Sequence, residues 1–249
     1  MPQIAEALVE QFISEGYCVL ERAIPGEELA TIVESCDSHL ARQLDDMARA
    51  GADVLGLSHK DKRYFLSCRH EGNRAMEQLL FGERMAEIVG TLLGGDAFLF
   101  LELFIVKARR TGMSFGWHQD SGYLLGNQHA PYLSLWCALD DVTAENGALH
   151  VLPYDRAGTR EVVPHQKERD SGDFVGFRGD DPGIVVPVPR GSIVALSSTL
   201  FHRSGPNTTD APRRAFLASY SSLPITDAKG RIWEQAVPFL RSGVRVHGM

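Results

Sequence analysis

Hydrophobic residues follow two different spacings along the chain, one in roughly the first 95 residues and another after them. Apolar residues recur at helical spacing in three early stretches, so we expect helices over about 4–12, 26–50 and 76–92. Pro25 stands at the start of the second stretch and Gly51 just past its end, which is the usual asymmetry of helix termini. The third stretch ends at Gly94. The first part of the chain is therefore predicted to be mostly helical.

Between these helices, residues 52–71 show no clear period. We expect a loop here, with a short strand over 64–68. Long irregular segments in compact domains often form lids or binding loops. This segment is accordingly a candidate cover for a binding site.

After residue 96 the pattern changes to short β-rich runs separated by Gly, Pro, Asn and Asp. The runs are 97–108, 131–142, 147–153, 183–189, 191–202 and 213–222. Helices followed by many strands predict an α+β fold with a mainly β core, and this strand spacing is typical of a sandwich or jelly roll. We expect a single domain over 1–249, with a mostly helical wrap over 1–95 and a jelly-roll core over 96–225.

Charge and hydropathy exclude some classes of partner. The net charge of −7 disfavours nucleic acid and anionic membranes. The longest nearly apolar stretch, 97–106, is too short to cross a bilayer and contains Glu102. The first twelve residues are acidic and lack the apolar region of a signal peptide. We expect a small-molecule substrate and no nucleic acid or membrane partner. The oligomeric state is left open.

The four cysteines give no metal or disulfide pattern. No two form a C-x-x-C pair, and none lies near enough to another to read as a zinc site. We interpret them as isolated, semi-buried hydrophobic residues of a protein in a reducing cytoplasm.

The strongest chemical signal is the sequence Trp117-His118-Gln119-Asp120. In an extended segment, residues two apart point to the same face, so His118 and Asp120 can aim at one point. Two histidines and one carboxylate around a metal with open positions is the arrangement of non-haem iron oxygenases. The third ligand must come from elsewhere. We favour His202, because it ends the strong strand pattern 191–202.

An arginine follows this distal histidine. The turn-rich stretch 203–212 separates His202 from the strand run that begins at Arg213. If the two runs pair as an antiparallel hairpin centred near residues 207 and 208, Arg213 lies roughly opposite His202. A guanidinium beside a metal can hold a carboxylate through two hydrogen bonds. A bound 2-oxo acid requires that combination.

Several phrases of the sequence resemble a known family. WHQDSGY, LSLWCALDDVTAENGALHVLP and FHRSGPNTTDAPRRAF are similar to the phytanoyl-CoA dioxygenase family of 2-oxoglutarate oxygenases, as is the opening VEQFISEGYCVLE. The resemblance covers most of the chain and is weakest over about 51–72. It implies a double-stranded β-helix, a cupin-like jelly roll, wrapped by N-terminal helices and holding iron at its mouth.

The resemblance also assigns residues. It places the metal triad on His118, Asp120 and His202, and the 2-oxoglutarate-binding arginine on Arg213. Ser204, two residues after the distal histidine, and Trp136, in the LSLW phrase, are expected to line the cofactor pocket. Arg214 would point to the opposite face of its strand, so it is not assigned this role.

The expected activity follows from these residues. We expect an Fe(II)- and 2-oxoglutarate-dependent dioxygenase that uses O2 to hydroxylate a small molecule and releases succinate and CO2. Related halogenases carry a small residue in place of the triad carboxylate, and here Asp120 is present. Desaturation, cyclisation and epimerisation stay open. The alternatives are a sensor that binds 2-oxoglutarate and metal without turnover, and a hydroxylase of proteins or peptides.

Other candidate residues have a plainer interpretation. The remaining seven histidines are expected to be structural or exposed, and His59 and His70 rank slightly above the others as candidates for contact with the site because their segment is the candidate cover. Lys60, Lys62 and Arg63 are interpreted as solvated loop charges. Tyr123 is a candidate cavity residue, although a packed or exposed aromatic fits the pattern nearly as well.

Overall fold

The computed structural model describes residues 4–247. Residues 1–3 and 248–249, the two ends of the expected 1–249 domain, lie outside the described residues. The helices within 4–247 are α1 (Glu6–Glu15), α2 (Gly26–Ala50), α3 (Arg74–Phe81), α4 (Glu83–Leu92), α5 (Tyr154–Ala157) and the 3-10 helix η1 (Asp120–Leu124).

The strands form two main antiparallel sheets. In the described part of the chain the larger sheet has ten strands: β1 (Tyr17–Leu20), β2 (Val54–Leu55), β3 (Ser58–His59), β4 (Arg63–Ser67), β5 (Ala97–Lys107), β7 (Leu133–Ala138), β12 (Ile193–Ser197), β14 (Arg213–Ser221), β15 (Val237–Arg241) and β16 (Val244–Arg245). The smaller sheet has four: β6 (Phe115–His118), β8 (Leu149–Leu152), β11 (Ile184–Val186) and β13 (Phe201–Ser204). A short pair, β9 (Gln166–Lys167) and β10 (Phe174–Val175), lies apart from both.

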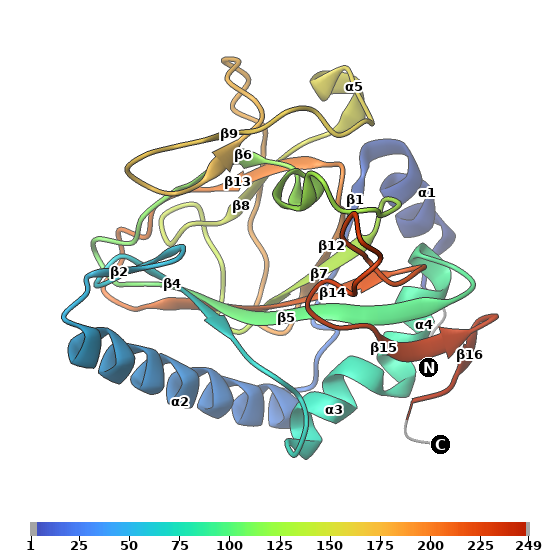
Figure 1. The fold of residues 1–249 in the computed structure, drawn as a ribbon, viewed down its shortest axis with the longest axis horizontal. Helices are drawn as coiled ribbons and strands as arrows, with labels where there is room; N and C mark the ends of the chain where they lie inside the picture. The colour runs from blue at the N-terminus through green and yellow to red at the C-terminus, as the bar shows by residue number, and fades with distance from the viewer. Residues whose placement is uncertain (1–3, 248–249) are drawn as a thin grey trace.

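The two main sheets enclose the interior, and the N-terminal helices cover the outside of the larger one (Figure 1). The order of the larger sheet is β1-β12-β7-β14-β5-β4-β3-β2, with β15 also pairing with β5. Buried residues of α2, α3 and α4 pack on its outer face with residues such as Phe104 and Phe216. Its inner face packs on the smaller sheet through residues such as Trp136 and Val151. The expected jelly-roll fold with a helical wrap is confirmed.

Helix α2 forms where the sequence predicts it. Its buried residues, Leu29, Ile32, Cys36 and Met47, follow helical spacing and face the larger sheet. Gly51 ends the helix in the left-handed region, with φ 60°, and its N–H donates to Ala48 O at 3.2 Å. Glycine adopts this conformation at little cost, which explains the sharp stop.

The single helix expected over 76–92 is wrong, because the chain forms two helices with a break at Gly82. This residue is extended, with φ −69° and ψ 170°. A Cβ atom here would lie only 2.4 Å from Gln78 O, so the close approach requires glycine. The helical period of the sequence continues across the break, so periodicity alone does not reveal it.

The structure differs from two other expectations. Residues 52–71 contain the expected short strand, β4, and in addition the hairpin β2–β3. The run 191–202, expected as one strand, divides into β12 of the larger sheet and β13 of the smaller sheet. His202 is therefore the second residue of a new strand rather than the end of a long one.

No helix within residues 4–247 has both the length and the apolar character needed to cross a membrane.

Candidate metal centre

Two histidines that are 84 positions apart in the sequence become neighbours across β6 and β13. His118 ends β6, and its partner in the antiparallel register is His202. The centres of the two imidazole rings lie 4.1 Å apart, and both side chains are buried. Opposite residues in an antiparallel pair share one face, so both rings point into the space between the sheets.

Hydrogen bonds fix how each ring is oriented. His118 Nδ1 lies 2.8 Å from Gly116 O, and His202 Nδ1 lies 3.1 Å from Leu200 O. A carbonyl oxygen can only accept, so each Nδ1 carries the hydrogen and each Nε2 keeps a free lone pair. Burial, together with the nearby His202, holds the pKa of His118 well below its usual range. The neutral imidazole that this favours is the form that binds metals.

Asp120 brings a carboxylate to the same point. The chain stays extended through Gln119 and then turns into η1, which Asp120 begins. Asp120 Oδ1 lies 3.7 Å from His118 Nε2 and 3.6 Å from His202 Nε2. Its other oxygen, Oδ2, accepts a hydrogen bond of 2.6 Å from Ser134 Oγ. One oxygen is thus held by the protein while the other faces the two imidazoles.

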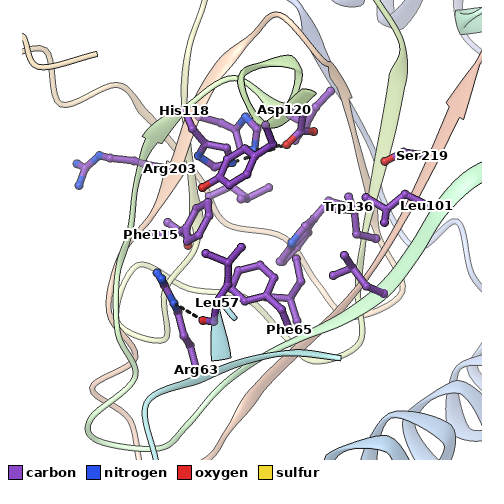
Figure 2. Close-up of a pocket in the computed structure, with 18 of the residues that line it drawn as sticks. Leu57, Arg63, Phe65, Leu101, Phe115, His118, Asp120, Trp136, Arg203 and Ser219 are labelled. Carbon is purple, nitrogen blue, oxygen red and sulfur yellow. Dashed lines mark hydrogen bonds and ion pairs between the residues drawn. The ribbon is translucent and has the colours of Figure 1, made fainter. Parts of the chain in front are cut away.

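These three side chains fit a divalent metal ion. Their ligand atoms all lie within 4.8 Å of one another. His118 and Asp120 stand together at one end of the cavity (Figure 2). Two imidazole nitrogens and one carboxylate oxygen on one side leave the opposite positions free, which is the donor set of non-haem Fe(II) sites.

Arg213 lines the same cavity and has no partner. Its side chain is 1% exposed, and its buried Nε and Nη1 atoms lack a hydrogen-bond partner among the described residues. The guanidinium carbon lies 5.3 Å from the centre of the Trp136 ring. Burial lowers the pKa of Arg213 to about 10. A buried, unpaired guanidinium is costly, so this site fits a bound carboxylate.

The hairpin that was expected to place Arg213 opposite His202 is wrong. The expected hairpin does not form, because the strand of His202 belongs to the smaller sheet and the strand of Arg213 to the larger one. The strand of Arg213 pairs with β5 and β7 instead. His202 and Arg213 nevertheless line the same cavity, from opposite sheets.

The interpretation of Arg63 as a solvated loop charge is also wrong. Its side chain is 1% exposed and forms an ion pair with Asp173. It also donates to Leu57 O at 3.2 Å, and to Ser114 O and Ser171 O at 2.8 Å. All of its hydrogen-bonding capacity is used in joining β4 to the β2–β3 turn and to two loops. Arg63 and Arg213 flank Lys107 in neighbouring strands, and only Arg213 is free.

The cavity has a volume of about 260 Å³ and a mostly apolar lining. The structure places Ser204, Trp136 and Tyr123, all named from the sequence, in this lining. The lining residues that the sequence did not single out include Leu57, Phe65, Leu101, Phe115, Tyr132, Ser219 and Trp233. Alternation along the LSLW phrase would have found Ser134, which holds Asp120, because it shares a face with Trp136.

His59 and His70 are buried and do not line the cavity, so both are structural, as expected for the remaining histidines. His59 Nε2 instead lies 3.0 Å from Ser171 O. The histidine that approaches the metal centre is His165, whose Nε2 accepts from Gln119 N at 2.9 Å. Gly122 and Gly176 leave room for this ring, since a Cβ on either would lie within 2.6 Å of it.

Comparison with known proteins agrees with this geometry. The family model described as phytanoyl-CoA dioxygenase (PhyH) matches residues 12–215. The chain belongs to the phytanoyl-CoA dioxygenase family. Among its relatives in this family, phytanoyl-CoA dioxygenase domain-containing protein 1 from Mus musculus is 29% identical over 139 residues. That match covers 53% of this chain and 45% of the mouse protein, so it spans less than half of the relative's length.

Solved structures share the fold of this family member. The epimerase SnoN, in complex with Fe3+, alpha ketoglutarate and nogalamycin RO, has a TM-score of 0.70 and 20% identity, covering 94% of this chain and 95% of SnoN. EvdO2 from Micromonospora carbonacea var. aurantiaca, complexed with 2-oxoglutarate, has a TM-score of 0.67 and 25% identity. The alignment covers 92% of this chain and 96% of EvdO2.

Proposed function

We propose that this protein is an Fe(II)- and 2-oxoglutarate-dependent dioxygenase that hydroxylates a small molecule. His118, Asp120 and His202 would hold the metal, and Arg213 would bind the far carboxylate of 2-oxoglutarate. One observation carries the proposal. A facial set of metal ligands and a buried guanidinium without a partner lie in a single cavity.

Each of these residues has a distinct part in the proposed reaction. When bound, Fe(II) and 2-oxoglutarate supply the oxidation, consuming O2 and releasing succinate and CO2. Arg213 neutralises and orients the co-substrate, with the Trp136 ring against the guanidinium. Ser134 keeps the Asp120 carboxylate turned so that Oδ1 faces both histidines. The apolar lining excludes water from the reacting centre.

Hydroxylation is the reaction we favour. The presence of the Asp120 carboxylate distinguishes this site from that of halogenases, where the position is open for halide. SnoN, which shares the fold, is an epimerase, so the fold is compatible with more than one outcome. The cavity, with a volume of about 260 Å³ and a mostly apolar lining, favours a small molecule over a protein substrate.

We further propose that residues 1–249 act as one domain in a reducing compartment such as the cytoplasm. The larger sheet joins β1–β4 from the N-terminal part to β5, β7, β12 and β14 from the core. Cys18, Cys36, Cys68 and Cys137 are all buried and unpaired, which is the usual state in a reducing environment.

Calorimetry and product analysis of the purified protein test the proposed function. We expect 2-oxoglutarate to bind only when Mn(II) or Fe(II) is present, and succinate to form only with Fe(II), 2-oxoglutarate and O2 together. If 2-oxoglutarate does not bind to the metal-loaded protein, the proposal is wrong. Binding without succinate formation across a broad metabolite panel would instead indicate a sensor.

A further inference from the structure

The cavity extends along the inner face of β14, so positions on this strand order the groups that line it. Arg213, Leu217 and Ser219 all line it, as alternation along a strand requires. Ser219 is the register partner of Ser134, which donates to Asp120, so the metal centre lies level with Ser219. Arg213 begins the strand six positions earlier, about 20 Å away between Cα atoms at a rise of ~3.4 Å per residue.

This direction divides the cavity into two halves. The Arg213 side chain reaches toward Trp136, whose register partner is Leu217, so the guanidinium and the metal centre stand at the two ends of one half. The co-substrate of the proposed function would occupy that half. The other half lies beyond Ser219, where a molecule can approach the metal centre without displacing the co-substrate.

The half beyond Ser219 is built from apolar and aromatic side chains. Leu101 is the register partner of Ser219, and Phe100 precedes it on β5. The Phe100 ring centre lies 4.9 Å from that of Tyr132 and 6.0 Å from that of Trp233. Figure 2 shows Leu101 and Ser219 together at the side of the cavity away from Arg63.

Among the residues that the structure describes, no charged side chain lines the half beyond Ser219. Asp120 belongs to the metal centre, and Arg63 is paired with Asp173. Lys107 Nζ donates to the carbonyl oxygens of Met113, Ser204 and Gly205. The Arg203 guanidinium points away from the cavity in Figure 2 and donates to Pro182 O at 3.2 Å. Arg213 is taken by the co-substrate, so the remaining half is neutral.

The direction of the hydrogen bonds around Ser219 can be worked out. Ser134 has one hydroxyl hydrogen, and the Asp120 carboxylate can only accept it, at 2.6 Å. In the 3.2 Å contact between Ser134 Oγ and Ser219 Oγ, Ser219 must therefore be the donor. Once its hydrogen is used, Ser219 offers only an acceptor to a molecule in the cavity.

We propose that the half beyond Ser219 is a subsite for a neutral, mostly apolar small molecule that carries a hydrogen-bond donor facing Ser219. Ser219 is then a specificity-determining residue, and it also connects the occupant of the subsite to Asp120 through Ser134. This inference rests on the proposed function, because the co-substrate is needed to fill the Arg213 half.

Three naphthalene probes of similar size test the subsite by calorimetry on protein loaded with Mn(II) and 2-oxoglutarate. The probes are 2-naphthol, which is a neutral donor, 2-methoxynaphthalene, which lacks the donor, and 2-naphthoate, which is an anion. We expect 2-naphthol to bind roughly fivefold more tightly than the ether, from one hydrogen bond. We expect 2-naphthoate to bind at least roughly tenfold more weakly than 2-naphthol, because its charge would be buried without a partner.

A matched pair of variants assigns the preference to Ser219. Ser219→Ala should bring the affinities of 2-naphthol and the ether together. Ser221→Ala should keep their ratio, because Ser221 is also buried on β14 but does not line the cavity. Binding of 2-oxoglutarate is measured first in every sample, so its loss reports on the proposed function and not on the subsite.

Several results would overturn the subsite while leaving the dioxygenase standing. These are 2-naphthoate binding as tightly as 2-naphthol, a preference for 2-naphthol that survives Ser219→Ala, or no binding of any probe to protein that binds 2-oxoglutarate. If Ser219→Ala does not fold, the order of the three affinities in the wild-type protein still decides the question.

Discussion

The described residues contain two clusters of histidine and carboxylate side chains that look equivalent by distance. His118, Asp120 and His202 form one, and the second cluster consists of His70, Glu71 and Glu102. In each, the three ligand atoms lie within 4.8 Å of one another, and the histidines are buried. They differ in what the remaining atoms of these side chains do.

In the cluster of His118, Asp120 and His202, backbone carbonyls accept the Nδ1 hydrogens and Ser134 donates to one oxygen of Asp120, so both Nε2 atoms and the other Asp120 oxygen stay free. In the second cluster, His70 Nδ1 lies 2.8 Å from Glu102 Oε1. The same oxygen also accepts from His70 N at 3.2 Å and from Gln235 Nε2 at 3.3 Å. In the second cluster, the carboxylate and the imidazole therefore form a hydrogen bond with each other, which leaves this oxygen less available to a metal.

The location of Glu102 explains this use. Along β5, pairing with β4 reaches Leu103, and pairing with β15 begins at Leu99. Glu102 lies in the gap and secures the chain that leaves β4. A cluster of this kind can bind a metal only where neighbouring groups orient its side chains and leave the lone pairs of the ligand atoms free. Glu102 Oε2 is buried without a partner among the described residues, and the substitution of Glu102 below tests whether this oxygen binds a metal.

The largest expected difference concerns metal binding and turnover. Asp120→Ala should weaken Mn(II) binding by ~100-fold or more and abolish succinate formation, because it removes a ligand. Glu102→Gln should change neither. Titration calorimetry should give one metal ion per wild-type chain. A second ion that disappears in Glu102→Gln would show that both clusters bind metal and that the comparison fails.

The contrast between free and occupied groups extends to two adjacent arginines. Arg213→Ala should weaken 2-oxoglutarate binding about 10- to 100-fold, at ~1.5–3 kcal/mol for a charged hydrogen bond. Arg214→Ala is the matched control, because Arg214 faces outward and pairs with Asp140 and Asp37. Calorimetry with Mn(II)-loaded protein measures both. Equal effects of the two substitutions would mean that the clamp is assigned to the wrong residue.

The second cluster should matter for stability rather than for turnover. His70→Ala should lower the free energy of unfolding by about 1.5–3 kcal/mol, since the buried Glu102 carboxylate loses a hydrogen bond. His118→Ala should abolish turnover while leaving the protein folded. Urea denaturation and succinate assays on both variants would sharpen the comparison. Loss of turnover in folded His70→Ala protein would contradict it.

The smallest effect concerns the thiols, one of which lies beside the second cluster. Burial raises the pKa of Cys18, Cys36 and Cys137 to about 12, and burial and Glu102 raise the pKa of Cys68 further. The unfolded chain ionises first, near pH 9, so the free energy of unfolding should fall as pH rises from about 9 toward 12.

Thiol labelling and denaturation at several pH values check this expectation. A thiol reagent at pH 8 should leave all four cysteines of the native protein unmodified and react with all four after denaturation. Rapid labelling of Cys68 in the native protein would show that the second cluster is open to solvent. Stability that stays constant above pH 9 would contradict the raised pKa values.

Much of the fold can be predicted from the local spacing of apolar residues and from the glycines that end helices. Helix α2 follows from its apolar stripe and its terminal Gly51, and the strand runs after residue 96 correspond to β5, β7, β8, β11, β12, β13 and β14. Local spacing does not predict the break at Gly82 or the division of 191–202 between two sheets. Apolar spacing indicates which face of an element is buried, but not which other element covers that face.

The site divides in the same way. His118, Asp120, His202 and Arg213 were named from residue type, spacing and family resemblance, and the structure brings all four to one cavity. The predicted pairing of the strands of His202 and Arg213 is wrong, because strands that are close in sequence need not be neighbours in one sheet. Ser134 could have been found only through its alternation with Trp136, and Ser219 carries no distinctive signal, because serine is common in strands and on surfaces alike.

By itself, the sequence determined which chemical groups are available and which segments form helices and strands. These depend on side-chain chemistry and on short-range backbone preferences. Tertiary structure alone decided which groups stay free. Arg63 and Arg213 are both buried arginines, and only the packing of distant segments gives Asp173 to Arg63 and leaves Arg213 without an acceptor among the described residues. The partners that satisfy a buried polar group come from anywhere in the chain, so no local pattern encodes them.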